Sequence, residues 1–91
     1  MKKAAKVFIS GNVQGVFFRS FIKENADKLN IRGYVRNLED GRVEAVLEGD
    51  NEAVDEMLKL CKKGAPHSVV KNVEILERKY DSLKDFKILH I

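Results

Sequence analysis

The chain has little cysteine, little histidine and no long hydrophobic run, and each shortage argues against a class of function. Its one cysteine, Cys61, cannot form a disulfide within the chain, so we expect a reducing, cytoplasmic location. The two histidines, His67 and His90, have no second ligand at metal-binding spacing, so we expect no metal and no cofactor. No apolar run is long enough to span a bilayer, and the first residues lack the apolar core of a signal peptide, so no membrane association is expected.

Length and composition predict one globular domain over residues 1–91. The chain is 44% hydrophobic and 34% charged, which is typical of a folded protein with a single core. The net charge of +3 is modest, and residues of both signs are mixed along the chain. Such a surface is usually just solvated, although a small positive excess also attracts small anionic substrates. The high charged fraction and the single glutamine, Gln14, weakly indicate a thermostable protein.

The stretch Gly11–Arg19 predicts a site for an anion. It follows an alternating apolar run at residues 4–10, which predicts a strand, and leads into helix-spaced apolar residues at 18–29. The first amides of a helix lack partners and lie at the positive end of its dipole. Glycines let further loop amides turn toward one point, and Arg19 adds a two-pronged cation that suits phosphate or carboxylate oxygens. The contributing amides belong to Asn12, Val13, Gln14, Gly15, Val16, Phe17 and Phe18.

The spacing of these glycines leaves a second interpretation open. The same stretch also fits an ordinary turn between a strand and a helix, with Arg19 as a solvated residue of the first helical turn. Neither the nucleotide P-loop pattern nor the dinucleotide pattern Gly-x-Gly-x-x-Gly is present. A phosphatase with a cysteine nucleophile is excluded as well, because an arginine at the required distance from Cys61 would fall on His67.

The rest of the chain completes a β-α-β-β-α-β order. Besides the elements above, we expect strands at 33–38, 42–48, 69–79 and 86–90, a helix at 52–62, and a frayed start over Met1–Lys3. The turn Glu39–Gly41 joins two of these strands as a hairpin. This order predicts an α+β, ferredoxin-like split βαβ sandwich. Its four-stranded antiparallel sheet would carry both helices on one face.

Two longer patterns resemble a known family. Residues Ile9–Arg19 are similar to the first signature of the acylphosphatases, and Gly33–Gly49 are similar to their second signature. Both match at every specified position, in the family's order and spacing, so the resemblance covers nearly the whole chain. It implies the same ferredoxin-like fold and an enzyme that hydrolyses acyl phosphates to a carboxylate and inorganic phosphate without a metal.

The resemblance also implies roles for individual residues. Arg19, together with the loop amides, would bind the phosphoryl group, and Asn37 would position the attacking water. In some relatives the terminal carboxylate pairs with the arginine, which makes the same pairing conceivable for Ile91. The expected partner is a small acyl phosphate such as acetyl phosphate, 1,3-bisphosphoglycerate or carbamoyl phosphate. We expect a monomer that binds no nucleic acid.

The chemistry of phosphoryl transfer is consistent with these roles. The protein mainly has to position the reactants and stabilise charge. Asn37 is no general base near neutral pH, but its amide accepts a hydrogen bond from water and donates one to phosphate. A carboxylate leaves readily without a protein acid, and the substrate's own phosphate oxygen takes the water proton. Alkyl phosphates, which have poor leaving groups, should therefore be poor substrates.

Three other functions compete with acyl phosphate hydrolysis. A nucleic-acid-binding module would use aromatic residues on the open sheet face, where only Phe8 and Tyr34 are offered. A regulatory domain would bind an anion without turnover, although it would not need the amide of Asn37. The same site could also serve within a larger carbamoyl-transfer protein.

Overall fold

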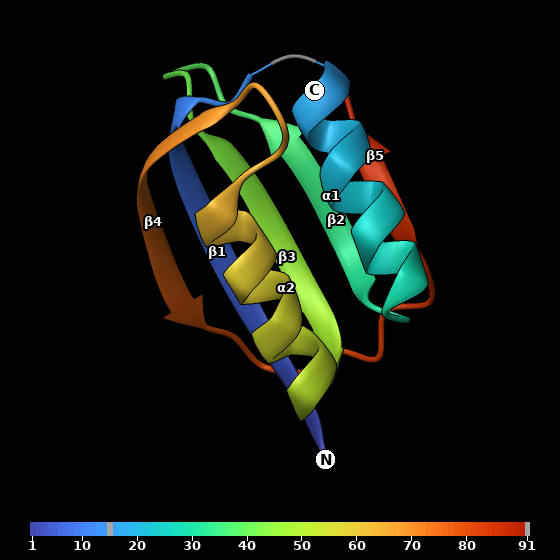
Figure 1. Cartoon of the computed structure of the whole chain (residues 1–91). Coiled ribbons are helices and arrows are strands. Elements are labelled where there is room, and N and C mark those ends of the chain that lie inside the picture. The colour runs from blue at the N-terminus through green and yellow to red at the C-terminus, as the bar shows by residue number, and fades with distance from the viewer. Residues whose placement is uncertain (15, 91) are drawn as a thin grey trace.

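The structure is a computed structural model that describes residues 1–14 and 16–90 (Figure 1). Two helices lie on one face of a five-stranded sheet, whose strand order is β4-β1-β3-β2-β5. The elements are β1 (Lys2–Asn12), α1 (Val16–Lys28), β2 (Arg32–Asn37), β3 (Val43–Asp50), α2 (Asn51–Lys63), β4 (Val69–Glu77) and β5 (Phe86–Leu89). The predicted split βαβ order is therefore confirmed.

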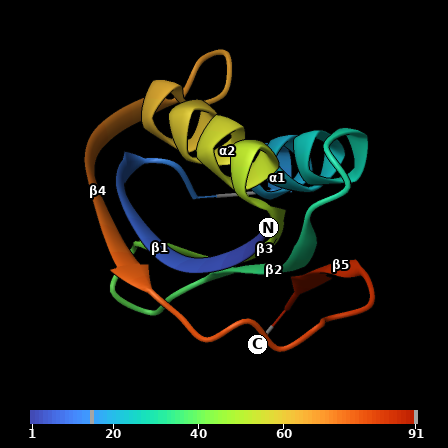
Figure 2. The ribbon, with the colours of Figure 1, turned by 90° about the horizontal axis from the view of Figure 1, so that it is seen from below.

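The sheet differs from the predicted four-stranded antiparallel sheet in one respect. β4, β1, β3 and β2 are antiparallel as expected, but β5 adds a fifth strand that runs parallel to β2. The cause is the crossover segment, residues 78–85, which carries the chain from one sheet edge to the other across the face opposite the helices (Figure 2). The buried carboxylate of Glu48 accepts hydrogen bonds from the amides of Asp81 (2.6 Å) and Leu83 (2.8 Å) and so holds this segment.

The expected frayed start is also wrong. β1 begins at Lys2, which lies opposite Asp50 in the β1–β3 register, and the carbonyl of Met1 accepts a hydrogen bond from Asn51. The Lys2 ammonium lies 2.9 Å from the Asp50 carboxylate and lowers the pKa of that carboxyl. Asp50 therefore precedes α2 without capping it through its side chain.

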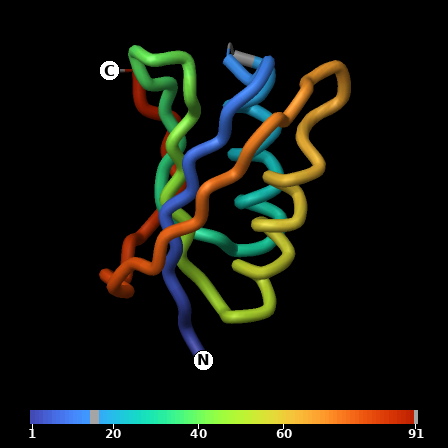
Figure 3. The backbone as a smooth tube through the Cα atoms, turned by 90° about the vertical axis from the view of Figure 1, so that its left-hand side faces the viewer, coloured from blue at the N-terminus to red at the C-terminus, as the bar shows by residue number. Residues whose placement is uncertain are grey.

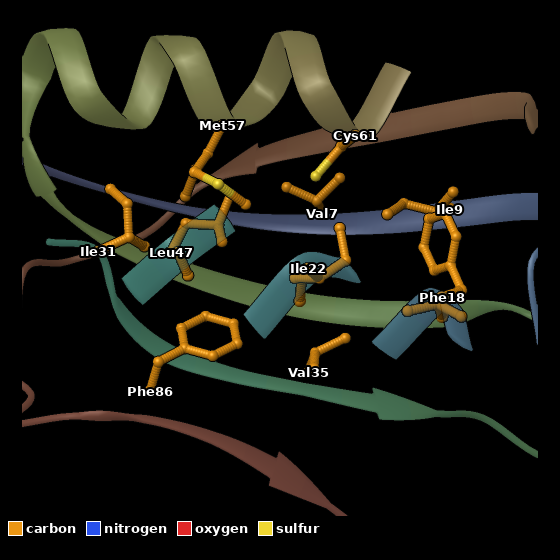
Figure 4. Close-up of a cluster of buried hydrophobic side chains, with 14 of the residues drawn as sticks. Val7, Ile9, Phe18, Ile22, Ile31, Val35, Leu47, Met57, Cys61 and Phe86 are labelled. Atoms are coloured by element: carbon orange, nitrogen blue, oxygen red, sulfur yellow. The ribbon is translucent and has the colours of Figure 1, made fainter. Parts of the chain in front are cut away.

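The core forms between the helices and the helix-facing side of the sheet. Alternate residues of each strand point into it, as the period of a strand requires, and Figure 4 shows Val7, Val35 and Leu47 doing so. Met57 and Cys61 from α2 complete the layer, and both are fully buried. Burying each valine, leucine or methionine side chain of this layer stabilises the fold by about 1.5–3 kcal/mol. Cys61 is thus a small buried residue of the core, and burial raises the pKa of its thiol to about 12.

The register brings one end of β1, β2 and β3 to the same end of the sheet. Ile9 of β1 lies opposite Val43 of β3, and Val43 lies opposite Asn37 of β2. The neighbouring row of paired residues on the same face, two positions away along each strand, is Val7, Ala45 and Val35, and it is buried. Because side chains two positions apart lie on the same face of a sheet, Asn37 lies on the helix-facing side. The start of α1 lies at the same end of the molecule (Figure 1).

Candidate active site

Arg19 lies in the first turns of α1 and reaches toward the last residues of the chain. Its Nη1 atom is 3.1 Å from Nδ1 of His90, which directly follows β5. Because a guanidinium has no acceptor, the imidazole must accept through Nδ1. His90 thereby orients one side of the Arg19 guanidinium.

Asn37 ends β2 beside the same histidine. Arg36 lies opposite Leu89 in the parallel β2–β5 register, so the next residues along the two strands, Asn37 and His90, are neighbours. The side-chain Oδ1 of Asn37 is buried and accepts no hydrogen bond from residues 1–14 or 16–90. A buried acceptor without a donor costs about 1–3 kcal/mol, so this oxygen is prepared to accept a bond from a ligand or a water.

Gln14 joins the loop after β1 to the hairpin that follows Asn37. Its side-chain Nε2 donates to the carbonyl of Leu38 (2.9 Å) and, more weakly, to that of Arg42 (3.4 Å). The hairpin is closed by the amide of Leu38, which donates to Arg42 (2.8 Å). The loop and the end of β2 are thus held next to each other by hydrogen bonds.

The predicted cradle of amides, Asn12–Phe18, is only partly a loop. Asn12 still belongs to β1 and lies opposite Val69 of β4, whereas Val16, Phe17 and Phe18 already belong to α1. α1 begins two residues before the predicted helix. The early start escaped prediction because Phe17 is 87% exposed and lies outside the apolar stripe. Val13 and Gln14 form the connection between strand and helix, and Gly15 lies outside the described residues.

The start of α1 carries a cation and no acid. α1 has no acidic residue in its first turn, where acids are usually favourable, and it carries Arg19 there instead. The nearby acid Asp40 is paired with Arg42 at 2.8 Å, and its hydrogen bonds to Arg42 lower the pKa of the Asp40 carboxyl. A cation beside the positive end of a helix favours a bound anion.

Two contacts of the residues predicted from the sequence were not foreseen. Arg19 and Asn37 both lie beside His90 at one end of the sheet. Sequence analysis had assigned no role to His90, because nothing in the sequence reveals the parallel pairing of β5. It also missed the side chain of Gln14 as a link to the hairpin.

Among residues 1–14 and 16–90, no three or more histidine, cysteine, aspartate or glutamate side chains gather closely enough to hold a metal ion. None of the helices in this part of the chain combines the length and the apolarity that crossing a membrane takes.

Comparison with known proteins decides the family. The family model for acylphosphatases matches residues 5–88. The chain belongs to the acylphosphatase family. The acylphosphatase of Rubrobacter xylanophilus is 53% identical, over 82% of this chain and 68% of that protein. Membership confirms the predicted family and enzyme class, whereas the roles of Arg19, Asn37 and the loop amides remain predictions.

Solved acylphosphatase structures share the fold over nearly the whole chain. The acylphosphatase from Coxiella burnetii has a TM-score of 0.91 at 33% identity, covering 97% of this chain and 93% of its own. The Bacillus subtilis acylphosphatase has a TM-score of 0.90 at 36% identity, covering 98% and 99%. These matches confirm the ferredoxin-like fold.

Proposed function

We propose that this acylphosphatase hydrolyses small acyl phosphates to a carboxylate and inorganic phosphate through attack of water at phosphorus. The observation that carries the proposal is the buried Oδ1 of Asn37, which lacks a donor among the described residues and lies at the end of β2, next to the His90 that Arg19 contacts. A site for a stable anion needs donors alone. An acceptor next to those donors serves a nucleophile that must be held and aligned.

Arg19 and the loop amides would bind the phosphoryl group. The guanidinium pairs two oxygens at once, and amides near the start of α1 face the remaining charge. The hydrogen bonds from these donors would become stronger as negative charge shifts among the phosphoryl oxygens in the transition state. Stronger binding of the transition state than of the substrate is the condition for accelerating the chemical step. His90 would act as a positioning residue, because it accepts from Nη1 and so limits the rotation of Arg19.

Asn37 would orient the water. Its Oδ1 accepts one water hydrogen, and its Nδ2 donates toward a phosphoryl oxygen. The water proton passes to a phosphate oxygen, and the P–O bond to the acyl group breaks with its electron pair leaving on the carboxylate. This route asks the protein for neither a general acid nor a metal.

The structure argues against a nucleic-acid platform on the open sheet face. The Arg42 guanidinium lies 4.7 Å from the centre of the Phe8 ring and covers it. The middle of this face carries the buried carboxylates of Glu44 and Glu48, and the crossover segment passes over it. The crossover segment therefore covers part of the surface on which bases would have to stack.

The proposal is tested by hydrolysis of benzoyl phosphate with EDTA present. We expect Arg19→Gln to lower kcat/KM by about 10³-fold, and Asn37→Ala by about 10²-fold, since each removes a group that is aligned in the transition state. Arg32→Gln and Asn72→Ala are matched controls at exposed strand positions and should retain wild-type activity.

Two results would contradict the proposal. Activity that disappears with EDTA and returns with a divalent metal would exclude the metal-free route. A folded wild type that binds inorganic phosphate without turning over any acyl phosphate would favour a regulatory anion-binding domain instead.

A further inference from the structure

A cleft opens on the helix side of the candidate site. It has a volume of about 710 Å³ and lies between the first half of α1 and the loop that joins α2 to β4. That volume is typical of a site for a small molecule. Its apolar walls come from Phe17, Phe18 and Phe21 on one side and from Ala65 and Pro66 on the other. We call it the α1 cleft.

The α1 cleft begins where the proposed phosphoryl site ends. Asn12, at the end of β1, and Gln14, in the connection between β1 and α1, also line the cleft. Figure 3 shows this connection between the β2–β3 hairpin on one side and the α2–β4 loop on the other. A molecule bound by Arg19 and the loop amides therefore has an apolar surface next to it.

The direction of the reaction selects this side for the leaving group. In phosphoryl transfer, the attacking and leaving oxygens lie roughly in line on opposite sides of phosphorus. Asn37, which would hold the water, lies at the end of β2 beside the hairpin. The leaving oxygen must then point away from the hairpin, toward the α2–β4 loop and the α1 cleft.

We propose that the α1 cleft receives the acyl group of the substrate and favours uncharged, apolar acyl groups. This inference rests on the proposed function, because it needs the water on the Asn37 side. No lysine or arginine is among the described residues that line the cleft, so a second anionic group would find no permanently charged partner there, and His67 is the one basic side chain among those residues. Glu24, at one side of the cleft, would repel such a group.

The far wall of the cleft is held in shape without a ligand. The amide and the hydroxyl of Ser68 both donate to the carbonyl of Ala65, at 3.0 and 2.7 Å, and close a tight turn. His67 within this turn has a φ of 66°, a conformation that few residues other than glycine adopt. On the near wall, Phe17 exposes 87% of its surface, which an apolar acyl group would cover.

Filling the cleft tests the proposal. Ser20 is an exposed α1 residue that lines the cleft, so Ser20→Leu adds volume there and introduces a better helix former than serine. The readout is kcat/KM for benzoyl phosphate divided by kcat/KM for acetyl phosphate. Glu56→Leu makes a similar change at an exposed α2 position outside the cleft and serves as the control.

We expect Ser20→Leu to lower this ratio at least fivefold and Glu56→Leu to leave it unchanged. The larger acyl group loses its binding surface, whereas acetyl phosphate still fits beside the phosphoryl site. A ratio that changes less than fivefold in a folded Ser20→Leu variant overturns the cleft assignment while the proposed function stands. A wild type that hydrolyses neither substrate overturns the proposed function itself.

Discussion

Replacing Glu48 with glutamine should loosen the crossover segment and destabilise the protein by about 2 kcal/mol. The Glu48 side chain is 1% exposed, and its two oxygens accept from the amides of Asp81 and Leu83. Glutamine keeps one acceptor but turns an N–H₂ group toward one of these donors. The loss of a charge-assisted bond costs about 1.5–3 kcal/mol, and an unsatisfied buried donor costs about 1–3 kcal/mol more.

Relief of the buried charge offsets part of this cost, which is why the net value lies near 2 kcal/mol. For a chain of this size, that corresponds to a fall in Tm of about 8–16 °C. The assay is thermal unfolding followed by circular dichroism, and Glu77→Gln is the exposed strand control, expected within about 0.5 kcal/mol of wild type. Hydrogen exchange should also show the amides of Asp81 and Leu83 losing protection. A Glu48→Gln variant as stable as the control would refute the assignment of Glu48 as the anchor of the crossover segment.

Two further predictions concern the core and the sheet. Because the thiol of Cys61 is fully buried with a pKa of about 12, a disulfide reagent should leave it unmodified in the native protein near pH 8 and should modify it fully in denaturant; rapid native-state modification would contradict the burial. Gly33 has a φ of 143°, and a Cβ there would lie 1.8 Å from the carbonyl oxygen of Val46. Gly33→Ala should therefore cost more than about 3 kcal/mol. Gly41→Ala, where φ is 96° and space is open, should cost about 1–2 kcal/mol from strain alone, and equal losses in chemical denaturation would contradict the clash.

Much of the fold was predictable because the period of apolar residues changes clearly between strands and helices. The fifth strand could not be placed from this periodicity. Alternation at residues 86–90 predicts a strand, but it does not say which neighbour the strand joins or in which direction. Both follow from the path of the crossover segment, which is hydrogen-bonded to Glu48. In the sequence, Glu48 looks like an outward-facing polar residue, but its carboxylate is buried.

The sequence predicted which residues belong to the candidate site, but it did not predict their contacts with one another or with other side chains. The two signatures single out Arg19 and Asn37. The hairpin at Glu39–Gly41 predicts that the strand bearing Asn37 pairs with the strand that follows it. His90 could not be connected with them, because its position follows from the parallel pairing of β5. The loop was expected to be longer, since the start of α1 depends on end effects that hydrophobic periodicity does not report.

The central claim is that water attacks phosphorus and that the acyl carboxylate leaves. It is tested most directly by hydrolysing acetyl phosphate in water labelled with a heavy oxygen isotope and analysing both products by mass spectrometry. The account predicts one labelled oxygen in the inorganic phosphate and none in the acetate. Label in the acetate would show attack at the carbonyl carbon, and it would contradict the roles proposed for Arg19 and Asn37.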